Sequence, residues 1–228
     1  MKSITRAFNL MSAMFFIVVG GIVLIFKRNN YKPIYKGVRY FLQHESYQIS
    51  LRTLMNDPQT KELIDSRYRE GIPVNWNELK ALPPQTLGYE FAKFMNNPDV
   101  TPINKLPESR DKINPELDYL RARIRLIHDI HHVVCGYGAD EIGEMGISAF
   151  YIAQINSPLN SMILAFGLIK CTLKSPARLP ELMNMLTHGW QMGLTTPNLF
   201  GVKWEEMWAL PLDEVRHQLK IQAIKVAA

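Results

Sequence analysis

The sequence has few of the signals that mark β-strands. It has no long alternating runs of Val, Ile and Thr, and no Asn-Gly or Asp-Gly pairs of the kind that close tight hairpins. Apolar residues recur instead at helical spacing, punctuated by proline and glycine. With 228 residues, 47% of them hydrophobic, the chain is long enough to bury one substantial core. We therefore predict an all-α fold, built as a single multi-helix domain.

Signals for several common functions are missing as well. The chain has no phosphate-binding glycine loop, no nucleophile elbow, no internal repeat and no basic-aromatic pattern, so we expect no nucleic-acid partner. Its two cysteines, Cys135 and Cys171, lie in apolar helical contexts rather than at disulfide spacing. That placement favours a reducing compartment.

Acidic residues are absent from positions 1–44, which hold seven basic residues. The remainder is nearly neutral, so the net charge of +5 originates in this segment. The segment also contains Ala13–Phe26, a run of fourteen uncharged residues, extended upstream by Phe8, Leu10 and Met11. We predict two parts for the chain: a basic, apolar N-terminal segment, residues 1–44, and a helical domain, residues 45–228.

The apolar run is short for a bilayer span, which needs about 20 residues. One interpretation places it at a membrane interface or in a lipid cavity, where flanking basic residues would hold it to anionic headgroups. The others are a buried structural helix and a cleaved targeting segment, although no small-x-small cleavage site follows the run. On the first interpretation, a membrane surface is a partner, and Phe16 and Ile17 contact lipid.

Half of the six histidines lie together in the stretch Ile127-His128-Asp129-Ile130-His131-His132. Apolar residues at helical spacing surround them, so a helix would place His128 and His132 on one face, with Asp129 at its edge. Two imidazoles with carboxylates suit zinc, manganese or ferrous iron. The alternative, ordinary polar histidines on a half-exposed helix, fits a lone histidine better than this cluster.

A second carboxylate is expected to reach the same face. Gly136 and Gly138 should end the helix, and Asp140 can cap the next one. Glu144 then falls on the first turn of that helix, after the chain has doubled back. The predicted metal ligands are therefore His128, Asp129, His132 and Glu144, on an αα turn.

The spacing His128-Asp129-x-x-His132-x11-Glu144 resembles the H-D-x-x-H-x11-E signature of the coenzyme Q biosynthesis protein 4 family. Two further segments resemble that family in the same order: Pro83-Pro84-Gln85-Thr86-Leu87-Gly88, and Trp204-Glu205 with Pro211-Leu212 and Arg216. The resemblance covers roughly residues 40 to 222. It implies a ubiquinone-pathway protein that binds zinc and associates peripherally with a membrane. That membrane would be the inner mitochondrial membrane, on its matrix side, in a eukaryote, and the cytoplasmic face in a bacterium.

The resemblance also implies a prenylated quinone precursor as the ligand. An enzyme of this kind would be a metal-dependent lyase or oxidoreductase, and oxidative decarboxylation with hydroxylation of the ring is the suggested reaction. The other hypothesis is a non-catalytic scaffold that presents an isoprenoid lipid to other quinone-biosynthesis enzymes. Magnesium fits if a lipid phosphate shares the metal. A closed structural zinc site ranks last, because two carboxylates would be unusual there. A homodimer is a further expectation.

A second apolar stretch, Leu159–Leu173, follows Ser157-Pro158, which has the form of a helix start. A helix that is apolar nearly all round is usually a central core element. The alternative is that it lines an apolar cavity for a polyprenyl tail, as the abundance of methionine also suggests. On that alternative the predicted lipid contacts here are Met162, Ile163, Phe166 and Ile169.

Overall fold

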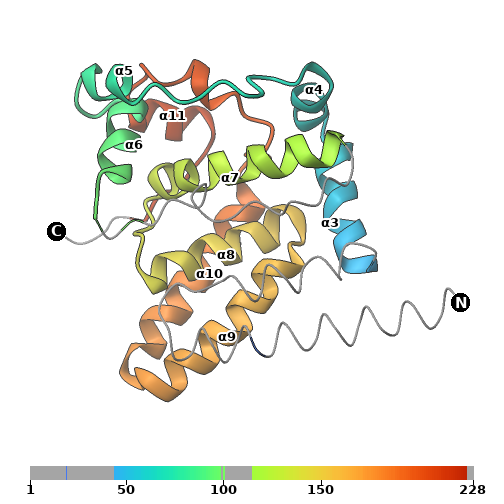
Figure 1. The fold of residues 1–228 in the computed structure, drawn as a ribbon. Helices are drawn as coiled ribbons and strands as arrows, with labels where there is room; N and C mark the ends of the chain where they lie inside the picture. The colour runs from blue at the N-terminus through green and yellow to red at the C-terminus, as the bar shows by residue number, and fades with distance from the viewer. Residues whose placement is uncertain (1–18, 20–43, 99, 101–114, 225–228) are drawn as a thin grey trace, which may run out of the picture. The chain divides into compact units, whose positions relative to one another are not determined.

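The computed structural model describes residue 19, residues 44–98, residue 100 and residues 115–224. Within these ranges there is no β-strand; only an isolated bridge joins Thr86 and Pro211. The all-α prediction is confirmed. The helices, labelled in Figure 1, are α3 (Glu45–Asn56), α4 (Pro58–Ser66), α5 (Trp76–Ala81), α6 (Leu87–Met95), α7 (Pro115–Cys135), α8 (Glu141–Ile155), α9 (Pro158–Lys174), α10 (Leu179–Thr195) and α11 (Leu212–Gln218), with 3₁₀ turns η2 (Pro176–Arg178) and η3 (Trp204–Glu206).

The chain divides into two compact units. The described part of the first consists of residue 19 and residues 44–53 and 148–194, and that of the second lies within residues 54–147 and 195–224. Residues 1–18 and 20–43 lie outside the description. The predicted N-terminal segment, with Phe16 and Ile17, therefore stays a prediction.

Helix α7 is the centre of the second unit. Helices α4, α6 and α11 all contact it (Figure 1). Its residues Ile127, Ile130 and Val134 are completely buried. Fully burying an apolar side chain of this size contributes roughly 1.5–3 kcal/mol. The helix that carries the histidine cluster is therefore held by the core of its unit.

The two proline-containing segments singled out in the sequence meet each other in this unit. The backbone N–H of Leu87 donates to the carbonyl of Leu210 at 2.9 Å, and that of Gly88 donates to Trp208 at 2.9 Å. A Cβ at Gly88 would lie 3.1 Å from the Cβ of Trp208, so the close approach favours glycine. Segments at least 120 residues apart are thus joined by backbone hydrogen bonds and one isolated β-bridge at the start of α6.

Two arginines tie α7 to the C-terminal segments. The Arg216 guanidinium donates to the carbonyls of Val134 and Val133 at 2.9 and 3.0 Å, which satisfies carbonyls in the last turn of α7. Nearer the other end, Arg123 makes a bidentate, buried ion pair with Glu205. Removing one partner of such a pair costs about 3–5 kcal/mol. The position of α7 therefore depends on the segment containing Trp204.

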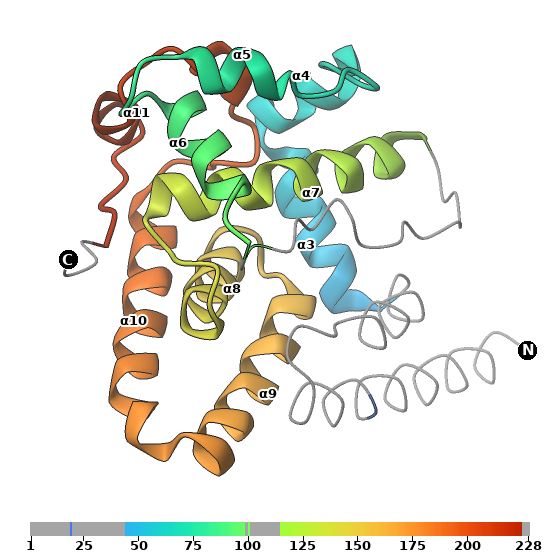
Figure 2. The same ribbon diagram turned by 60° about the vertical axis from the view of Figure 1, so that its left-hand side comes forward.

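In the first unit, α9 begins as the sequence predicts. Ser157 is the N-cap, with its hydroxyl accepting from the N–H of Asn160, and Pro158 is the first helical residue. The expectation of a central core helix differs from the observed burial, because only Asn160 and Ile163 of α9 are buried. Figure 2 shows α9 leading through η2 into α10. No helix within the described ranges combines the length and apolar character required to cross a bilayer.

Candidate metal centre

The end of α7 places the two outer histidines of the cluster on successive turns. The i, i+4 spacing puts His128 and His132 on the same side of the helix, as predicted. Gly136 then adopts a φ of +76°, a left-handed conformation that ends the helix and favours glycine. The backbone N–H of Tyr137 still bonds to the carbonyl of His132 at 2.9 Å.

The turn after α7 brings the next helix back toward these histidines. Asp140 caps α8, because its carboxylate accepts from the N–H of Gly143 at 3.0 Å. Gly143 lies so close to Gly138 that an added Cβ would be 1.9 Å from the Gly138 carbonyl oxygen. Glu144, the next residue, is carried toward α7 by this contact. The predicted αα turn is confirmed.

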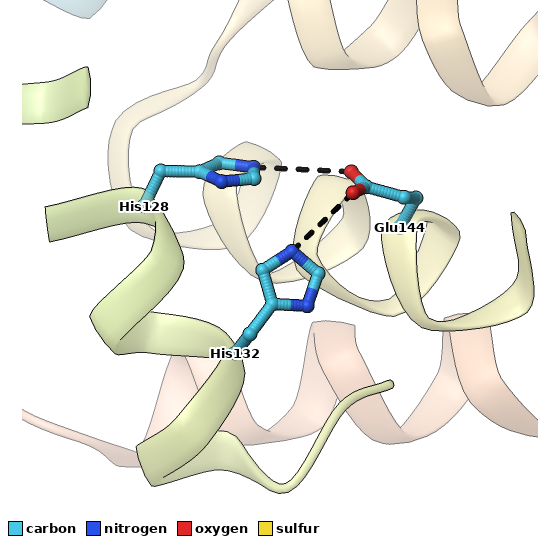
Figure 3. A group of neighbouring side chains, drawn as sticks. All are labelled: His128, His132 and Glu144. Carbon is cyan, nitrogen blue, oxygen red and sulfur yellow. Dashed lines mark ion pairs between the residues drawn. The ribbon is translucent and has the colours of Figure 1, made fainter. Parts of the chain in front are cut away.

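Figure 3 shows the resulting group of His128, His132 and Glu144. One ligand atom from each residue lies within 4.8 Å of the others. The separations between the Nε2 atoms and the Glu144 carboxylate oxygens are 3.8 Å for His128 and 3.5 Å for His132. The His132 side chain is 1% exposed and that of Glu144 is 27% exposed, so the group is accessible from its carboxylate side.

The other ring nitrogen of each histidine has an acceptor of its own. His128 Nδ1 lies 3.2 Å from Asp129 Oδ1, and His132 Nδ1 lies 3.1 Å from the carbonyl of Gly138 and 3.3 Å from that of Tyr137. Carbonyls and ionised carboxylates only accept hydrogen bonds, so Nδ1 carries the proton in both rings. The Nε2 lone pairs are then available on the side facing Glu144.

The distances from the histidine Nε2 atoms to the Glu144 carboxylate fit the ligands of one metal ion better than they fit direct hydrogen bonds. At 3.5 and 3.8 Å, the contacts to Glu144 are longer than the usual range for such bonds. A tetrahedral shell with metal–ligand bonds of about 2.0–2.1 Å places neighbouring ligand atoms about 3.4 Å apart. Two imidazole nitrogens and one carboxylate oxygen are also the donors that borderline divalent cations accept.

Asp129, a predicted ligand, and the neighbouring His131 both lie outside the group of His128, His132 and Glu144. Asp129, predicted as a ligand, is 6% exposed and lies outside the three-residue group, against His128 Nδ1. His131, which the sequence did not assign as a ligand, is completely buried and packs edge-on against Phe200 and Trp204. Burial lowers the pKa of His131 to about 3, so its ring is neutral at physiological pH.

The charges of the group influence one another. Burial opposes protonation of His128, but the hydrogen bond to Asp129 and the charge of Glu144 raise its pKa overall. Burial by itself raises the pKa of the Glu144 carboxyl, but the charges of His132 and His128 lower it overall. Both directions favour a protonated His128 beside an ionised Glu144, and a bound metal ion would take the place of the proton on Nε2.

Sequence reasoning missed two supports of the site. The ring of Phe94, on α6, stacks on His132 with centroids 5.5 Å apart. The carbonyls that orient His132 come from the turn itself, and backbone groups leave no mark in the residue types. The two glycines of that turn were the available signal, because they permit the conformation that brings those carbonyls to the ring.

The predicted lipid contacts on α9 lie along the helix at graded exposure. Ile163 is buried, Met162 and Phe166 are half-buried, and Ile169 is 45% exposed. Met162, Phe166 and Ile169 follow the 4, 3 spacing of one helix face. The structure thus places three of the four predicted contacts in a single stripe, while the predicted cavity stays a prediction.

Comparison with known proteins places this chain in a family. The model of the coenzyme Q (ubiquinone) biosynthesis protein Coq4 family matches residues 43–225. The chain belongs to the Coq4 family. The resemblance inferred from the motifs is therefore confirmed, and the match begins and ends within a few residues of the range predicted from them.

Curated members of the Coq4 family support the assignment. The chain is 29% identical over 174 residues to the mitochondrial ubiquinone biosynthesis protein COQ4 homolog of Aedes aegypti, covering 76% of this chain and 62% of the relative. The Danio rerio homologue, also named mitochondrial, is 29% identical over 178 residues, with 76% and 64% covered. The chain thus spans less than two thirds of the length of these relatives.

A solved structure shares the fold. A crystal structure of a candidate ubiquinone biosynthesis protein from Nostoc punctiforme superimposes with a TM-score of 0.75 at 26% identity. The alignment covers 94% of this chain and 97% of the other. The likeness therefore extends over both compact units.

Proposed function

We propose that this Coq4 family chain acts in ubiquinone biosynthesis and binds one divalent metal ion through His128 Nε2, His132 Nε2 and the carboxylate of Glu144. The observation that carries the proposal is the hydrogen bonding of both Nδ1 atoms, which aims both Nε2 lone pairs at one carboxylate. Metal-binding histidines in proteins are oriented in this way by acceptors at the other ring nitrogen.

Asp129 has a positioning role in this proposal. Its carboxylate accepts from His128 Nδ1 and so raises the basicity of the ligand nitrogen, while the metal is held by the other three residues. Zinc is the metal that the family resemblance favours. Manganese and ferrous iron suit the same donors, and magnesium would require more oxygen ligands, such as a lipid phosphate.

The second part of the proposal is that the chain binds a long isoprenoid lipid or a prenylated quinone precursor. The support lies on α9, where Met162, Phe166 and Ile169 form a continuous apolar stripe next to buried Ile163. The methionine side chain is unbranched and polarizable, so it can adapt to the shape of a flexible tail. Phe16 and Ile17 are proposed as contacts from the N-terminal segment.

In the enzyme hypothesis, the chain replaces the carboxyl group of the prenylated ring by a hydroxyl group and releases CO₂, with dioxygen as the oxidant and the source of the new oxygen atom (ArCOOH + ½ O₂ → ArOH + CO₂). A divalent metal with three protein ligands supplies Lewis acidity at its open coordination positions. The chain's own residues would bind and orient the metal. His128 would donate its Nδ1 proton to Asp129, and His132 would donate its Nδ1 proton to the turn carbonyls, so that both Nε2 atoms face the metal. The half-exposed Glu144 side marks where a substrate oxygen could approach.

The alternative is a scaffold that holds the lipid and presents it to other quinone-biosynthesis enzymes. The side chains beside the group of His128, His132 and Glu144 favour this alternative. Cys135 and Tyr137 are buried, and burial raises the pKa of both, so neither is poised to act as a nucleophile or a base. Peripheral association with a membrane fits both hypotheses, on the matrix side of the inner mitochondrial membrane in a eukaryote or on the cytoplasmic face in a bacterium. A homodimer is compatible with either.

One experiment tests the metal and the lipid together. Elemental analysis of the purified chain should find about one divalent metal per chain, and mass spectrometry of its organic extract should find a polyprenyl compound. Turnover of a prenylated ring acid by the metal-loaded chain, measured as released CO₂, then separates the enzyme from the scaffold. A chain with neither metal nor polyprenyl compound would contradict the proposal.

A further inference from the structure

The stretch from Ser148 to Leu194 in the first unit is poor in charge, and its few charges lie at one place. Between Ser148 and Leu194 the only Asp, Glu, Lys or Arg residues are Lys170, Lys174, Arg178 and Glu181. They occupy the end of α9, the turn η2 and the start of α10, where the chain reverses direction (Figure 2). Arg178 pairs with Glu181 at 2.8 and 2.9 Å, and the set keeps an excess of positive charge.

Exposed apolar side chains lie among these cations. Ile169 and Leu173, one turn apart on α9, are 45% and 65% exposed, and Met183 on α10 is 50% exposed. Farther along α10, Trp190 and Leu194 are 42% and 56% exposed, 7 and 11 residues after Met183, which places them on the same helix face. Large apolar side chains in such numbers on a single hairpin mark an interaction surface.

We propose that the tip of this hairpin, residues 169–183, binds the surface of a lipid bilayer that contains anionic lipids. Leu173, Ile169 and Met183 would enter the boundary between headgroups and acyl chains, while Lys170 and Lys174 contact the headgroup phosphates. Basic residues beside apolar ones are the combination by which interfacial helices bind anionic membranes.

Charge favours the bilayer over two other occupants. A second copy packed tip to tip would bring the same positive charges together, because a two-fold contact pairs a surface with itself. The segment 1–44 has seven basic residues and no acidic one, so its charge is not complementary to that of the tip. An anionic surface is complementary to both. The tip also continues the α9 stripe of Met162 and Phe166, a connection to lipid uptake that rests on the proposed function.

The test places a dye at the tip of the full-length chain. An environment-sensitive dye on the thiol of Leu173→Cys, in a Cys171→Ser background, should shift to the blue on phosphatidylcholine vesicles that contain phosphatidylglycerol. The same dye on Ile72→Cys, an exposed apolar position in the second unit, is the matched control and should keep its aqueous spectrum. An aqueous spectrum at position 173 on bound vesicles would overturn the proposal.

Charge reversal gives the second measurement. The double variant Lys170→Glu, Lys174→Glu should bind these vesicles at least tenfold more weakly, whereas Lys80→Glu on α5 should bind as the parent does. Equal binding by the double variant would contradict the proposal, and so would a dye shift that needs only a high protein concentration, which indicates a second copy. Metal content should stay constant in these variants, so a failure at the tip is distinct from a failure of the proposed metal site.

Discussion

The α7–α8 corner, residues 128–144, and the α9–α10 hairpin, residues 158–195, differ in how their polar and apolar side chains are placed. In the corner, each polar side chain has a specified partner: Asp129 and two backbone carbonyls fix the imidazoles, and Glu144 faces both of them. In the hairpin, charge is scarce and large apolar side chains are exposed. The corner is suited to a small ion, whose binding depends on fixed ligand positions. The hairpin is suited to a fluid partner such as a lipid, whose binding depends mainly on the apolar area that is covered. Removal of the proposed ligands in the corner should therefore abolish metal binding, whereas single changes in the hairpin should weaken binding by degrees.

The largest expected effect is the loss of metal from the corner. The His128→Ala, His132→Ala double variant should contain no divalent metal by elemental analysis, because one carboxylate does not retain a borderline cation by itself. The exposed His217→Ala on α11 is the matched control and should keep about one metal per chain. His131→Ala should also keep it, although the cavity beside Phe200 lowers stability. Full metal content in the double variant would refute the site.

A smaller effect is expected at Asp129. The Asp129→Asn variant should bind metal about 10–100-fold more weakly, because the acceptor at His128 Nδ1 loses its charge while the three ligands remain. Competition with a chelator measures the affinity, and Asp65→Asn on the surface of α4 serves as the control. An Asp129→Asn variant with parental affinity would show that the carboxylate does not tune the site.

Much of this corner was predictable from the sequence. The i, i+4 histidines, the glycines that end α7 and the Asp140 cap are local features, and each depends on a few neighbouring residues. The contact of Asp129 with the ring nitrogen of His128 was not predictable, because an acid next to a histidine can face a metal or the ring nitrogen. That choice is set by the side-chain torsions, which neighbouring elements determine.

The hairpin was less predictable for a related reason. The start of α9 at Ser157-Pro158 follows local rules and was found. Whether its apolar side chains are buried depends on what packs against them, and an apolar pattern is the same for a core helix and for a docking helix. The long-range ties of α7 to Glu205 and Arg216 were missed as structural contacts for the same reason, although both residues lie in the segments that indicated the family.

For the proposed lipid contacts on α9, the affinity of the chain for an isoprenoid should increase with each isoprene unit that is added to the tail. Buried methylenes contribute about 0.8 kcal/mol each, so a fully buried isoprene unit of five carbons would tighten binding roughly a thousandfold, and a partly buried one by less, until the apolar surface is covered. Titration with prenylated phenols of increasing length measures this series. Phe166→Asp should reduce the gain per unit and leave metal content intact, with Ile72→Asp as control. A flat series would mean that α9 does not bind the tail.

The smallest effect is expected from the N-terminal segment. Deleting residues 1–44 should weaken co-sedimentation with anionic vesicles a few-fold, because the hairpin tip still binds. Higher salt should weaken the binding of the intact chain further, since the basic residues act through screened charge. If the truncated and intact chains bind equally at every salt concentration, the segment does not contribute to membrane affinity.

The most direct test of the metal centre is X-ray absorption at the edge of the metal that copurifies with the chain. The proposed site predicts two imidazole nitrogens at about 2.0–2.1 Å and one carboxylate from the protein, with solvent or ligand completing the shell. The shell should keep its composition in Asp129→Asn and lose one imidazole in His132→Ala. A parental shell with fewer than two imidazoles, or a carboxylate that disappears in Asp129→Asn, would contradict the assignment of His128, His132 and Glu144 as the metal ligands.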